Sequence, residues 1–153
     1  MEAAYHDNFG EFETADNVNG VFRFATFMAN LRQRHDALLQ NHWGDLIADD
    51  QDVSYLFRTP SGEGSTRGGD RTVGVYINSP GDNFFVMINM ADVSVQFTAP
   101  EISKGRFWRA LINTDVSEES HANYWAEGEG PVQEGSAQVP AWSVVVWQER
   151  AQA

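Results

Sequence analysis

The sequence predicts a mainly β protein, an antiparallel β-sandwich preceded by one long N-terminal α-helix. Apolar residues recur with a helical period within residues 16 to 42, and from Val53 onward they alternate with polar residues instead. The alternating segments are short and are separated by turn-forming residues, which favours antiparallel strands joined by tight connections. We therefore expect one helix in front of a sandwich.

The 153 residues suffice for one domain with a sizeable core and a short appendage. The first segment, residues 1–15, is polar and aromatic without a period, and we expect an extended lead-in there. Asp16 and Asn17 are suitable N-cap residues, so the helix is expected to start close behind them and to occupy the segment 16–42. The sandwich is expected to span residues 43–153.

The predicted helix has an apolar arc of roughly 220°, about twice the usual stripe of a surface helix. Its polar strip is narrow and consists of Arg23, Thr26, Asn30, Gln33 and Arg34. Such a helix is expected to have neighbours on two sides. Two interpretations stay open: the helix packs across the sandwich of this chain alone, or it also belongs to a larger helical layer.

Six strands are expected, at residues 53–58, 72–78, 84–90, 93–98, 106–113 and 143–149. In the segment 93–98 we expect Val93, Val95 and Phe97 to point inward. The turns at 79–83 and 91–93 are expected to join neighbouring strands. Two long connections, 59–70 and 117–140, are expected positions for function, and the second has room for a seventh short strand.

Composition excludes several classes of partner. A formal net charge of -12 with only 10 Lys and Arg disfavours nucleic acid and anionic membrane surfaces. The absence of cysteine excludes disulfides and thiolate chemistry. No run of about 18 apolar residues and no signal-peptide pattern is present, so we expect a cytoplasmic protein that does not span a membrane.

No cofactor or metal is expected from the motifs. Gly62, Gly64 and Gly68 have a GxGxxxG spacing, one residue too long for the dinucleotide fingerprint, and flexibility is the better interpretation of this loop. The acidic segment 49–54 lacks the glycine and the glutamate of a calcium loop. The four histidines have no close metal-binding spacing, and His35 is expected at the end of the helix.

No catalytic residue is predicted. There is no GxSxG motif around a serine. Two carboxylates would suffice for glycoside hydrolysis, and the acidic connection offers Glu118, Glu119, Glu127 and Glu129. Because loop carboxylates are ordinary on an acidic protein, they do not by themselves predict an active site.

The order of motifs resembles the C-terminal end of isoamylase-type glycogen and starch debranching enzymes, in the α-amylase superfamily (glycoside hydrolase family 13). The family's last barrel helix is matched by Phe22, Arg23, Phe24, Leu31, Arg32, His35 and Leu38. A family strand of the G-D-x-x-Y-V-M-x-N-A type is matched by Gly81, Asp82, Phe85, Val86, Met87 and Asn89. Its two later strands are matched by Trp108, Arg109 and Thr114, and by Ser143, Val144, Val145 and Val146.

The resemblance implies that this chain is a non-catalytic segment whose parent hydrolyses α-1,6-glucosidic branch linkages, with the catalytic carboxylates upstream in the barrel. The barrel of the same parent chain is then the expected partner. The expected barrel-packing face of the helix is Phe24, Phe27, Met28 and Leu31. Two departures stand out, since Asp36 replaces the usual proline and the 59–70 loop differs from the family's.

The alternative is an α-glucan-binding module, because sugar rings stack on exposed aromatic side chains. The candidates for such a surface are Trp43, Trp125 and Trp142. Trp108 is expected in the core.

Overall fold

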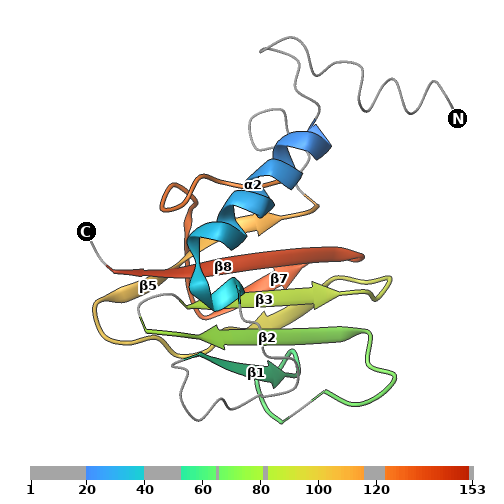
Figure 1. Cartoon of the computed structure of the whole chain (residues 1–153). Coiled ribbons are helices and arrows are strands. Elements are labelled where there is room, and N and C mark those ends of the chain that lie inside the picture. The colour runs from blue at the N-terminus through green and yellow to red at the C-terminus, as the bar shows by residue number, and fades with distance from the viewer. Residues whose placement is uncertain (1–19, 40–52, 65, 81–82, 116–122, 152–153) are drawn as a thin grey trace, which may run out of the picture.

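The computed structural model describes residues 20–39, 53–64, 66–80, 83–115 and 123–151. The lead-in 1–15, the N-cap candidates Asp16 and Asn17, and Trp43 lie outside these ranges. Within them the fold is the predicted one: mainly antiparallel β-structure with one α-helix in front (Figure 1).

Helix α2 spans Gly20–Arg34 and is followed by a short 3-10 helix, η1, at Asp36–Leu38. The helix therefore ends earlier than residue 42, the expected end. It ends because His35 leaves the helical conformation, with φ -121 and ψ 107. This extended residue turns its buried side chain toward the sheet, where it meets Glu127.

The main sheet has six antiparallel strands in the order β1-β2-β3-β8-β5-β6. In that order the strands are Ser54–Arg58, Thr72–Asn78, Phe84–Asn89, Ser143–Ala151, Arg106–Asn113 and Val132–Gln133. The bounds predicted for β2 and β5 are confirmed, and those of β1, β3 and β8 differ by one or two residues. The last strand in the sequence, β8, lies between β3 and β5.

A second, two-stranded sheet consists of β4 (Val95–Thr98) and β7 (Ser136–Val139). The connection 117–140, expected to hold one strand, thus contains both β6 and β7. The expectation that turn 91–93 joins neighbouring strands is wrong, because β3 pairs with β8 whereas β4 pairs with β7. The inward position expected for Val93 is also wrong: it precedes β4, in the turn, and is 59% exposed.

One face of the main sheet packs against this second sheet. The core between them holds large side chains, among them Phe85, Trp108 and Trp147 from the main sheet and Phe97 and Val139 from the small one. The rings of Phe85, Trp108 and Trp147 lie within 6.5 Å of one another, centroid to centroid. This arrangement makes the sandwich.

Helix α2 lies across the opposite face of the main sheet (Figure 1). Phe27 and Leu31 of the helix are buried there with Phe84, Leu111 and Val146. The consecutive residues Leu111 and Ile112 both lie on this face because the register of β5 against β8 shifts between Ala110 and Ile112, a β-bulge that turns one extra side chain toward the helix.

The bulge region requires a glycine at position 130. A Cβ atom at Gly130 would lie 1.8 Å from the carbonyl oxygen of Ala110. Instead, the close approach allows the backbone N–H of Ala110 to donate to Pro131 O (3.0 Å), and the Arg109 guanidinium to donate to Gly130 O (2.6 Å). The connection before β6 is thereby held against β5.

Candidate functional site

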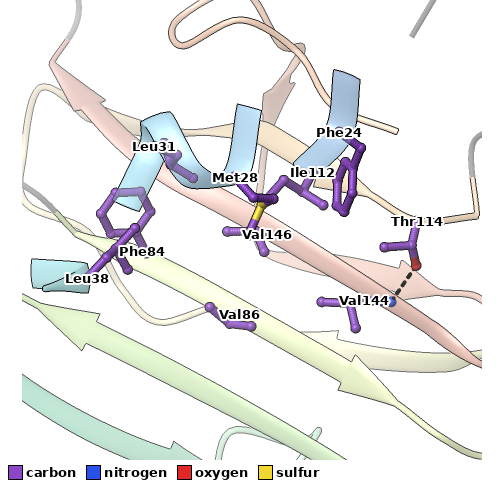
Figure 2. Close-up of a pocket in the computed structure, with 10 residues that line it drawn as sticks. All are labelled: Phe24, Met28, Leu31, Leu38, Phe84, Val86, Ile112, Thr114, Val144 and Val146. Carbon is purple, nitrogen blue, oxygen red and sulfur yellow. Dashed lines mark hydrogen bonds between the residues drawn. The ribbon is translucent and has the colours of Figure 1, made fainter. Parts of the chain in front are cut away.

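The most distinctive cavity is an apolar groove of about 330 Å³ between α2 and the main sheet. Its walls are Phe24, Met28, Leu31, Leu38, Phe84, Val86, Ile112, Thr114, Val144 and Val146 (Figure 2). Thr114 is the one polar residue among them, and its hydroxyl already accepts a hydrogen bond from the Val144 N–H at 2.9 Å. The groove therefore offers apolar contact and no acid–base chemistry.

Three of the four expected barrel-packing residues line this groove. Figure 2 shows Phe24 and Met28 reaching from the helix toward the sheet, with Met28 close to Val146. Leu31 is buried in the groove, whereas Met28 remains 38% exposed. The fourth residue, Phe27, stacks on Tyr124 with ring centroids 4.1 Å apart. The sheet of this chain is thus one neighbour of the wide apolar arc.

A charged cluster anchors the C-terminal end of α2 to the sheet. The Glu127 carboxylate lies 2.7 Å from Arg34 Nη2, 2.6 Å from His35 Nε2 and 2.9 Å from Arg150 Nη2. Gln148 donates to it from 3.4 Å. We call these five residues the Glu127 clasp. It joins the helix, the acidic connection and β8, so the helix end and the sandwich are held together.

The contacts of the Glu127 clasp argue against a role for Glu127 as the general acid of a glycosidase. Burial acts to raise the pKa of this carboxyl, but the hydrogen bond and charge of His35, the hydrogen bond from Gln148 and the charge of Arg34 outweigh burial and lower the pKa. A general acid in glycoside hydrolysis needs a raised pKa. Glu127 is instead a paired, ionised carboxylate, and Glu118 and Glu119 lie outside the described residues.

The tryptophans have three different environments. Trp108 is buried, as predicted, and its indole N–H donates to Pro100 O at 3.2 Å. Trp125 is half-buried and packs against the sandwich core. Trp142 is 64% exposed in the turn between β7 and β8. Of the candidate sugar-stacking residues that the structure describes, Trp142 presents the largest exposed fraction.

The Gly-rich connection between β1 and β2 is held by its own hydrogen bonds. Thr59 Oγ1 donates to Glu63 O, and the Arg67 N–H donates to the Asp70 carboxylate at 2.7 Å. Glu63, Arg67 and Asp70 line a shallow cavity there. With two carboxylates beside one arginine, the cavity does not provide the concentrated positive charge that a phosphate site needs.

In the part of the chain that the structure describes, no three His, Asp or Glu side chains are grouped to hold a metal ion. In the same ranges no helix is long and apolar enough to cross a membrane. The sequence matches no protein-family model, and no curated protein matches it significantly.

Sequence reasoning did not find the clasp. Glu127 and His35 are 92 residues apart, and nothing in either local pattern indicates that they meet. The one available signal was the position of His35 with Arg34 at the end of the helix, where positive charge is favourable and where an acidic partner is a natural expectation.

Proposed function

We propose that this chain is the non-catalytic C-terminal segment of an isoamylase-type debranching enzyme, whose parent hydrolyses α-1,6-glucosidic branch linkages of glycogen or starch. Its role is to stabilise the catalytic β/α barrel of the same parent chain. The residue matches of the helix and of the three sandwich strands support this parentage. The mainly β fold with one preceding helix agrees with the expected domain order.

The observation that best supports the stabilising role is the attachment of α2 to the sandwich. The helix buries Phe27 and Leu31 against the sheet and is tied to it by the Glu127 clasp. If α2 is the last helix of a barrel, this attachment makes the sandwich an extension of the barrel wall. Each buried large apolar side chain then contributes about 1.5 to 3 kcal/mol to holding the two parts together.

The helix also has a second surface suited to a barrel. Ala25 and Ala29 are exposed, and Met28 is partly exposed. Small side chains permit close approach of a neighbouring element. The wide apolar arc thus has one side on the sheet and another available to the barrel.

The parentage is tested by sequencing the transcript upstream of the Met1 codon. An in-frame barrel carrying the family's catalytic carboxylates is expected. A stop codon directly upstream, with no barrel gene beside it, would contradict the proposal.

The stabilising role is tested in that parent enzyme. Deleting residues 53–151 should lower the melting temperature of the barrel or leave it insoluble, and an equally stable truncated enzyme would rule the role out. A finer test is Met28→Glu, which should destabilise the parent more than the isolated chain. Thr26→Glu, a change on the polar strip of the same helix, is the matched control and should affect both alike.

A further inference from the structure

The turn between β7 and β8 displays a tryptophan in an unusual backbone conformation. Trp142 has φ 57, in the left-handed region that bulky residues rarely adopt. Its side chain is 64% exposed, so little burial offsets this conformational cost. A bulky residue that is both strained and exposed suggests a role in contact with another molecule.

A buried asparagine holds this turn rigidly against the turn after β3. Asn89 is fully buried, and its Nδ2 donates to Val93 O at 2.8 Å, Val139 O at 3.1 Å and Pro140 O at 2.9 Å. Its Oδ1 accepts from the Ala91 N–H at 2.9 Å. The backbone N–H of Trp142 in turn donates to Ala91 O at 3.2 Å.

The joined turns carry further exposed side chains of two kinds. Met90 and Val93 are apolar, with exposed fractions of 41% and 59%. Asp92 and Ser94 are polar and exposed. Among the described residues the indole N–H of Trp142 has no hydrogen-bond acceptor. We call Trp142 with residues 90–94 the Trp142 platform.

We propose that the Trp142 platform binds a neutral glucan chain by stacking a pyranose ring on the indole. The apolar C–H face of a pyranose ring can stack on the indole. The hydroxyls at the edge of the ring can form hydrogen bonds with the Asp92 carboxylate, the Ser94 hydroxyl and the indole N–H. The choice of an α-linked glucan rests on the proposed function.

Charge and size favour this occupant over nucleic acid, an anionic lipid and a protein partner. A net charge of -12 repels nucleic acid and anionic lipid headgroups, although nucleobases also stack on tryptophan. A stable protein interface buries about 800 Å² on each partner, whereas one exposed tryptophan offers about 150 to 250 Å². A single sugar ring fits that area.

The test is an NMR titration of the chain, with its five tryptophan indole N–H signals, against maltoheptaose. We expect a saturable shift of the Trp142 signal. Trp142→Gly, which suits φ 57, should keep the fold and weaken binding about tenfold or more. Phe57→Ala is the matched control, because Phe57 is an exposed aromatic residue on β1; this variant should bind as the wild type does.

Absence of a saturable Trp142 shift with maltoheptaose and with cellohexaose alike, or unchanged binding by Trp142→Gly, would overturn the proposal. So would concentration-dependent self-association that Trp142→Gly abolishes in the absence of any sugar response. Cellohexaose is the second probe: if it binds at Trp142 and maltoheptaose does not, the stacking platform stands while the debranching parentage loses support. If the chain binds no sugar at all, the sugar-binding proposal fails, whereas the debranching parentage is still tested separately by the sequence upstream of Met1. The failure of one proposal can therefore be distinguished from the failure of the other.

Discussion

The Glu127 clasp yields a quantitative prediction for Glu127→Gln. The substitution keeps the size of the side chain and removes the charge that faces Arg34, His35 and Arg150. Exposed ion pairs contribute about 0.2 to 1 kcal/mol and disruption of buried ones costs about 3 to 5 kcal/mol. Because the Glu127 side chain is 17% exposed and Arg34 and Arg150 are more exposed, we expect a loss of about 2 kcal/mol.

The pH dependence has a defined sign. The pKa of Glu127 is lowered in the folded state, so the ionised carboxylate stabilises the fold above its usual pKa of 4.5. That contribution is lost as the pH falls through the lowered pKa. Wild type and Glu127→Gln should therefore differ most near neutral pH and converge in acid.

Urea unfolding followed by circular dichroism at several pH values measures this difference. A loss of 2 kcal/mol corresponds to a fall in melting temperature of about 4 to 8 °C for a chain of this size. Hydrogen exchange should accelerate first at the C-terminal end of α2. Glu129→Gln, at an exposed carboxyl two residues away, is the control. Equal stability of Glu127→Gln and wild type at neutral pH would refute the clasp as an anchor.

Four further variants test the packing and the conformation of the Trp142 turn. Gly130→Ala should cost about 1 to 3 kcal/mol in thermal unfolding, because its Cβ would meet Ala110 O, and a neutral effect would show that the connection moves freely. Leu31→Ala should cost about 2 to 3 kcal/mol in urea, at the lower end for a buried leucine because the groove lets neighbours relax; Met28→Ala should cost less, and the reverse order would contradict the groove's assignment. Trp142→Gly should leave unfolding stability unchanged or raise it by up to about 1 kcal/mol, whereas a clear loss would mean that the indole stabilises the fold.

The strand positions could be predicted because their signals are local. Alternation of apolar side chains over 72–78 and 106–113, with turn residues on either side, sufficed for the bounds of β2 and β5. The two strands β6 and β7 were harder, since they are two and four residues long and have glycine or proline nearby. The exposure of Val93 was missed because alternation does not reveal where a strand begins.

The site depends on pairings between distant residues, which no local pattern encodes. The place of β8 between β3 and β5 and the meeting of Glu127 with Arg34 and His35 both follow from the completed fold. Trp142 was a candidate from its residue type alone. Its exposure and its left-handed backbone became visible only with the turn that Asn89 holds.

The central position of β8 has a consequence for synthesis of the chain. Strands β1 to β3 form one half of the main sheet, β5 and β6 form the other, and the two halves meet only through β8. Since Ser143–Ala151 leaves the ribosome after the other described strands of the sheet, neither half can complete its hydrogen bonding earlier in translation. The edges of β3 and β5 that later pair with β8 stay unpaired until β8 has been synthesised, and unpaired strand edges promote aggregation. A nascent chain halted before residue 143 should therefore depend on chaperones, and emergence of the nine-residue strand β8 should make it resistant to proteolysis in one cooperative step.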